Sequence, residues 1–91
     1  MQIRASSQKG RLLREFARAG HRGLTSYEAG KATGLADIPD CCYWKRVSEL
    51  AQLGDIELTG EQRLAATGEE RNVYRITTAG MRRVIGFDRA A

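Results

Sequence analysis

Apolar residues of this chain recur every three or four positions in three separate stretches, which is the period of an α-helix. The first predicted helix covers residues 6–19. It begins at Ser6 or Ser7, whose hydroxyl can accept a hydrogen bond from a free backbone N–H, and it stops before Gly20. Its apolar stripe consists of Leu12, Leu13, Phe16 and Ala17. We therefore expect one face of this helix to be buried and the rest to be solvated.

A capping box predicts where the second helix begins. In this motif the hydroxyl of Thr25 caps a backbone N–H, and the side chain of Glu28 reaches back to the cap. Gly34 can adopt the left-handed conformation that ends a helix. A turn over residues 34–40 follows, and Asp40 is expected to cap the next helix.

The third predicted helix covers residues 41–53, where Tyr43, Val47 and Leu50 form the apolar stripe. Trp44 is expected to pack beside this stripe rather than to stack on a base. A helical projection of about 100° per residue predicts which side chains face outward. Opposite the stripe lie Cys42, Lys45, Glu49 and Gln52, with Cys41, Arg46 and Ser48 at its two edges.

Beyond Gly54 the apolar period shortens to two, which indicates β-strands. Residues 56–59 alternate between apolar and polar, and residues 73–77 are rich in β-branched and aromatic side chains. The connection over residues 63–71 predicts a hairpin with its tip around Gly68. Thr78 is expected to cap a last short helix that carries Met81, Val84 and Ile85.

This order of elements predicts an α+β, mostly helical fold. Three amphipathic helices can bury their stripes around one core, and a two-stranded hairpin can close its side. Because a chain of 91 residues has room for one modest core, residues 1–91 are expected to form a single domain, with its core in about residues 7–85. The expected architecture is a three-helix core, a hairpin wing and a short C-terminal helix.

Three short segments add a resemblance: RVSEL at residues 46–50, GDI at residues 54–56 and VYRITTAG at residues 73–80. In this order they resemble the winged helix-turn-helix DNA-binding proteins of the small phage, prophage and actinobacterial type. The likeness spans about residues 7–84. It implies sequence-specific binding of double-stranded DNA by a small transcriptional regulator of phage or mobile-element origin. The third helix would enter the major groove, and the hairpin would lie on the backbone.

The resemblance also implies which side chains contact DNA. Lys45 and Arg46 match exposed basic positions of such helices, where they can bridge guanine O6 and N7 or hold a phosphate. Cys41 and Cys42 would lie closest to base edges, where a thiol can contact a thymine methyl group. The start of the second helix and the stem of the wing would meet phosphates. The full predicted set is Ser26, Tyr27, Cys41, Cys42, Lys45, Arg46, Glu49, Arg63, Arg71 and Arg75.

The formal net charge of +4 is unevenly distributed. Residues 1–24 carry +5, residues 25–60 carry −3 and residues 61–91 carry +2. The basic ends suit an anionic partner, whereas Glu69 and Glu70 at the wing tip would repel a phosphate. The three wing arginines therefore either contact the backbone or neutralise these glutamates. The alternative function is a winged-helix module that inhibits or recruits a host protein, or an accessory subunit of a replication or recombination complex.

Catalytic and metal-binding patterns are missing from the sequence. His21 is the only histidine and has no nucleophile or carboxylate at a readable spacing. Cys41 and Cys42 are adjacent, so a disulfide between them would be strained. They also lack the two-residue spacing of the cysteines in a zinc knuckle. We therefore expect a protein that is not an enzyme and that uses no metal or cofactor. Tyr74 is expected to pack rather than to stack on a base.

The chain has no apolar run long enough to cross a bilayer, so we expect no membrane contact and a cytoplasmic location. The C-terminal segment is more apolar than an exposed terminus usually is. It predicts either a homodimer through this segment or docking of the segment back onto the first helix. The apolar residues concerned are Met81, Val84, Ile85 and Phe87.

Overall fold

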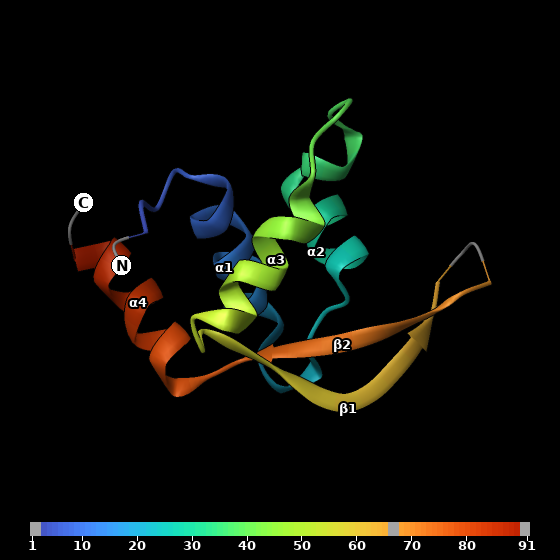
Figure 1. The fold of residues 1–91 in the computed structure, drawn as a ribbon. Coiled ribbons are helices and arrows are strands. Elements are labelled where there is room, and N and C mark those ends of the chain that lie inside the picture. Colours follow the sequence, from blue (N-terminus) through green and yellow to red (C-terminus); the bar gives the residue numbers. More distant parts are fainter. Residues whose placement is uncertain (1–2, 66–67, 90–91) are drawn as a thin grey trace.

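The computed structural model describes residues 3–65 and 68–89. Its elements are α1 (Gln8–Ala19), α2 (Ser26–Thr33), α3 (Tyr43–Gln52), β1 (Ile56–Leu64), β2 (Glu70–Ile76) and α4 (Thr78–Arg89), with single 3₁₀ turns at Gly20–Arg22 and Leu35–Asp37. Helices α1, α2 and α3 pack together, and the hairpin of β1 and β2 extends from them on the side away from α4 (Figure 1). The predicted α+β, mostly helical fold is confirmed.

Local capping signals place the first two helices as predicted. The hydroxyl of Ser7 accepts a hydrogen bond from the backbone N–H of Gly10 at 3.1 Å, so α1 begins at its predicted cap. Thr25 Oγ1 accepts from the backbone N–H of Glu28 at 3.1 Å, and Glu28 Oε1 accepts from the backbone N–H of Thr25 at 2.8 Å. The capping box of α2 is therefore complete, and Gly34, with a φ of 80°, ends the helix.

Helix α3 begins two residues later than predicted, because Asp40 does not cap it. Asp40 has a φ of 62°, whereas a capping residue has an extended backbone. The backbone N–H of Cys41 instead closes the turn by donating to the carbonyl of Ile38 at 3.3 Å. Cys42 takes the cap position, and its side chain caps no backbone group. Cys41 therefore precedes the helix.

The hairpin is longer and less regular than predicted. β1 and β2 pair antiparallel from Ile56 opposite Ile76 to Leu64 opposite Glu70, with a register shift between Leu58 and Gln62. Gly68 lies at the described end of the turn, with a φ of 89°. Residues 66–67, which belong to the predicted tip, lie outside the described residues.

A single residue before α2 extends the sheet. Leu24 and Tyr74 exchange two backbone hydrogen bonds, at 2.8 and 2.9 Å, so β2 lies between β1 and the segment that enters α2. Tyr74 is half-buried and packs against the core, as predicted. This pairing fixes the base of the hairpin beside the start of α2.

The core reaches past the predicted limits of residues 7–85, since Ile3 and Phe87 are both buried in it. Between these ends it contains Leu12, Leu13, Phe16, Ala29, Leu35, Val47, Leu50, Ile56 and Val84. Helix α4 has 12 residues, as many as α1, so the C-terminal helix is not short. Thr77 caps it rather than Thr78, because Thr77 Oγ1 accepts a hydrogen bond from the backbone N–H of Gly80 at 3.1 Å. Its apolar side docks back onto α1, and the guanidinium of Arg14 lies over the ring of Phe87 at 5.6 Å.

A buried ion pair locks α4 in place. Asp55, in the turn after α3, is only 1% exposed. Arg83 of α4 donates to its carboxylate, with Nε 2.6 Å from Oδ2. The backbone of Gly80 lies so close to the Asp55 carbonyl that an added Cβ would be 2.1 Å from that oxygen. Sequence periodicity does not reveal this pair, because its partners are 28 positions apart.

Candidate nucleic-acid interface

The outward face of α3 presents a row of exposed side chains. Val47 and Leu50 bury the opposite face in the core. The helical projection of the sequence places the centre of the outward face near Glu49. In the structure the exposed face is instead centred nearer Trp44 and Ser48. The exposed residues are Trp44, Lys45, Ser48 and Gln52.

Trp44 is half-exposed, at 50%, so the prediction that it packs beside the core stripe is wrong. Tyr43 packs against the core, as predicted, because Gly30 of α2 leaves room for its ring. An added Cβ at Gly30 would lie 2.6 Å from that ring. The Trp44 ring meets the Tyr43 ring edge to face, with centroids 5.2 Å apart. Adjacent residues of a helix are about 100° apart, so Trp44 cannot share the inward side with Tyr43.

Glu49 is engaged within the protein. Its carboxylate lies 2.6 Å from Nζ of Lys9 on α1 and 2.9 Å from a guanidinium nitrogen of Arg46. The hydrogen bond from Lys9 lowers the pKa of Glu49 from its ordinary value of 4.5, and the charge of Arg46 adds to this while desolvation opposes it. Glu49 therefore lies at the flank of α3 nearest the start of α1.

The two cysteines flank the start of α3 without projecting from its outward face. Cys41 is half-buried and packs against the core. Cys42 is half-buried, and its Sγ lies 4.0 Å from the carbonyl oxygen of Asp40. Both are free thiols. The prediction that Cys41 lies on the first turn of the third helix is wrong, because the turn before α3 extends to Cys42.

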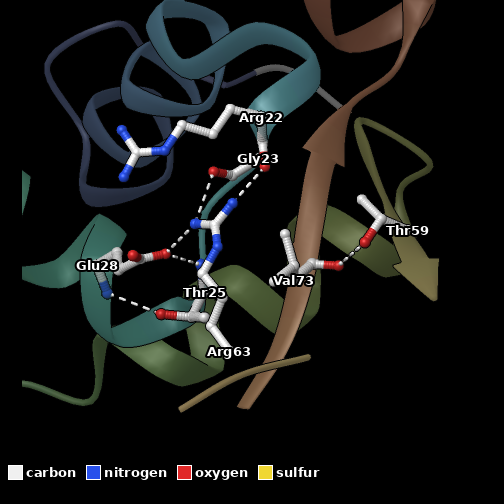
Figure 2. Close-up of polar contacts among 7 residues, drawn as sticks. All are labelled: Arg22, Gly23, Thr25, Glu28, Thr59, Arg63 and Val73. Atoms are coloured by element: carbon white, nitrogen blue, oxygen red, sulfur yellow. Dashed lines mark hydrogen bonds and ion pairs between the residues drawn. The ribbon is translucent and has the colours of Figure 1, made fainter. Parts of the chain in front are cut away.

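Arg63 fastens the hairpin to the start of α2 (Figure 2). Its guanidinium donates to the backbone carbonyls of Arg22 and Gly23, at 2.5 and 3.3 Å. It also donates to Glu28 Oε1 at 2.7 Å, the same oxygen that accepts the capping hydrogen bond from Thr25. Its side chain is 27% exposed. We refer to this set of contacts as the Arg63 clasp. It occupies an arginine that was expected to meet a phosphate or a wing glutamate.

The other two wing arginines are in exposed ion pairs. Arg71 contacts Glu69 at 3.1 Å, so one wing glutamate is neutralised as the second sequence alternative predicts. Arg75 contacts Glu57 at 3.0 Å, near the base of the hairpin, where it lines a groove with His21. Exposed pairs of this kind contribute less than about 1 kcal/mol, so a phosphate can compete for either arginine.

Some of the predicted residues come together between the wing and α2. Tyr27, Arg63 and Arg71 line one groove of about 190 Å³. Tyr27 is 42% exposed, whereas Ser26, the first residue of α2, is half-buried. Burial raises the pKa of the Tyr43 hydroxyl, and the nearby charge of Arg71 partly opposes this rise. Tyr43, at the start of α3, therefore lies within range of the charge of Arg71 on the wing.

Two kinds of site were also sought in the described part of the chain. Among residues 3–65 and 68–89, no three His, Cys, Asp or Glu side chains are arranged to hold a metal ion. Over the same residues, every helix is too short or too polar to cross a bilayer.

The fold is similar to that of a solved protein. The chain superposes on the crystal structure of a Streptococcus transcriptional regulator with a TM-score of 0.67, covering 90% of this chain and 78% of the other, at 19% sequence identity. Neither a protein-family model nor a curated protein matches the sequence. At this level of identity the likeness concerns the fold. Together with the order of helices and the hairpin beside α3, it shows a winged-helix fold.

Proposed function

We propose that this protein binds double-stranded DNA sequence-specifically, as a small transcriptional regulator of phage or mobile-element origin. In this proposal α3 enters the major groove and the hairpin lies on the backbone. The observation that carries it is the outward face of α3, where four side chains able to contact base edges project from one helix whose other face is fixed in the core. The similar Streptococcus protein is described as a transcriptional regulator, which supports the proposed function.

Each exposed side chain of α3 suits a different feature of the major groove. Lys45 can donate to O6 and N7 of guanine, and the Gln52 amide can pair with N6 and N7 of adenine. The apolar edge of Trp44 can contact a thymine methyl group. Ser48 can accept from or donate to either kind of base pair. Together they give a helix that discriminates among sequences rather than one that only attaches to the backbone.

The wing provides backbone contacts in this proposal. Arg71 is exposed, and its pair with Glu69 is weak enough to exchange for a phosphate. Tyr27, on the first turn of α2, can donate its hydroxyl to a neighbouring phosphate, where the helix N-terminus also favours an anion. Arg63 contributes indirectly, because its clasp holds the wing beside α2.

Selection of duplexes from a random library, followed by affinity measurements at two salt concentrations, tests the proposal. We expect one preferred sequence and an affinity that falls steeply with salt. Lys45→Ala should relax the preference at one base pair and weaken binding by about 1–3 kcal/mol. Arg89→Ala, at an exposed position near the end of α4, is the control and should bind as the parent does. Failure of the parent protein to bind any duplex at low salt would exclude the proposed function.

A second candidate function is binding to a host protein or to a replication or recombination complex. The exposed carboxylates of Glu69 and Glu70 and the 73% exposure of Leu64 favour it, because these features of the wing suit a protein surface better than a phosphate. Charge reversal at both glutamates should strengthen duplex binding if the wing faces DNA. A protein partner is favoured if this charge reversal abolishes the biological activity of the protein, whereas Lys45→Ala and Arg46→Ala leave that activity intact.

A further inference from the structure

A basic groove of about 440 Å³ lies between the start of α1 and α3. Three of the residues that line it are cations from distant parts of the sequence: Arg4 and Lys9 near the N-terminus, and Arg46 on α3. None of the lining residues is acidic. The other residues around the groove are Ile3, Ser7 and Gln8. The fold therefore gathers positive charge beside the outward face of α3.

Among the described residues, the charges that line the groove remain net positive when Glu49 is counted with them. Glu49 is the carboxylate that pairs there, and it is shared between Lys9 and Arg46. Arg4 is exposed and forms no ion pair within residues 3–65 and 68–89. The first turn of α1 has no acidic side chain, so nothing in that turn offsets the partial positive charge of the helix N-terminus.

Arg46 also has an unused donor. Its Nε is buried and has no hydrogen-bond partner among the described residues, although a terminal nitrogen of the same guanidinium contacts Glu49. A guanidinium held by one carboxylate still has donors for an oxyanion. The Arg46 side chain is 39% exposed, so its terminal nitrogens can donate to an anion in the groove as well as to Glu49.

We propose that Arg4, Lys9 and Arg46 bind neighbouring backbone phosphates of the duplex, as a second anchor on the flank of α3 opposite the wing. This inference rests on the proposed function. In Figure 1, α3 lies between the N-terminal segment and the hairpin. A helix in the major groove has a DNA strand on each side, so cations on both of its flanks meet both backbones. The anchor fixes the orientation of α3, and it carries no base preference of its own.

The salt dependence of duplex binding tests this anchor. It is measured with the duplex sequence that the parent protein prefers. Arg4→Gln should make the negative slope of log affinity against log salt less steep by about 1, because one phosphate contact is lost. Arg4→Gln combined with Lys9→Gln should make it less steep by about 2, with the base preference unchanged. Arg82→Gln on the exposed side of α4 is the matched control and should keep the parental slope.

The outcomes separate this inference from the function on which it rests. Lys9 also pairs with Glu49, so thermal unfolding is used to check that the double variant is folded. If the double variant is unfolded, the Arg4→Gln variant alone decides the test. If the parent protein binds and Lys45→Ala weakens it, but both groove variants keep the parental slope, the anchor is refuted and duplex binding stands. If the parent binds no duplex, both proposals fail.

Discussion

Replacing Arg63 with methionine should destabilise the protein more than the surface position of the hairpin suggests. The substitution removes two hydrogen bonds to the carbonyls of Arg22 and Gly23 and an ion pair with Glu28. It retains most of the aliphatic stem, so the packing of that stem is largely preserved. The Arg63 clasp connects residues 35 to 41 positions apart. Its loss therefore affects tertiary structure rather than a local turn.

The expected loss follows from the exposure of the groups involved. Hydrogen bonds to a charged group contribute about 1.5–3 kcal/mol each when they are well shielded. The side chains of Arg63 and Glu28 are 27% and 32% exposed, so solvent screening lowers this value. We expect a loss of about 2 kcal/mol for the whole clasp. For a chain of this length, that corresponds to a fall in Tm of about 10 °C.

Thermal unfolding followed by circular dichroism measures this loss. Arg71→Met is the matched control, because Arg71 lies on the same hairpin but has only an exposed pair with Glu69. It should cost less than about 1 kcal/mol. Amide hydrogen exchange should also be faster at Leu24 and Tyr74 in the Arg63 variant. Equal Tm values for the two variants would refute the reasoning, since they would show that the clasp adds no stability beyond an exposed ion pair.

Three further substitutions test other parts of the structure. Arg83→Met should cost about 3 kcal/mol in urea unfolding, since it leaves the buried carboxylate of Asp55 without its partner; an unchanged midpoint would contradict this. Gly30→Ala should displace the ring of Tyr43, cost about 1–3 kcal/mol and shift the fluorescence of the single tryptophan, which contacts that ring. The lowered pKa of Glu49 stabilises the fold above pH 4.5, and this contribution is lost as the pH falls further. Unfolding of the Glu49→Gln variant should therefore depend less on pH below 4.5 than unfolding of the parent.

Short-range signals were sufficient for most of the fold. The cap at Ser7, the capping box at Thr25 and the terminating Gly34 each act within four residues, so the sequence pattern contains the whole cause. Asp40 is the exception. An aspartate before a helical pattern suits a cap, but the turn after α2 places it in the left-handed region, where its side chain cannot fill that role.

The candidate site was less predictable because its geometry depends on distant residues. Lys45 is exposed as a projection of α3 alone predicts. Glu49 is not on the outward face, because Lys9, which is 40 positions away, reaches it from α1. The basic groove has the same origin, since Arg4 and Arg46 become neighbours only when the start of α1 packs beside α3. The local periodicity of the sequence predicts neither the Lys9–Glu49 ion pair nor the proximity of Arg4 to Arg46.

The Arg63 clasp bears on the proposed DNA binding as well as on stability. A hairpin wing that is mobile in the free protein loses conformational entropy when it binds the DNA backbone. Here the hairpin is fixed at two points: the Leu24–Tyr74 pairing at its base and the contact between Arg63 and Glu28 farther along β1. The distance between the wing and α3 is thus set in the free protein. In the proposed function, Arg63 makes no phosphate contact of its own but still favours binding, because it positions Arg71 before the duplex binds.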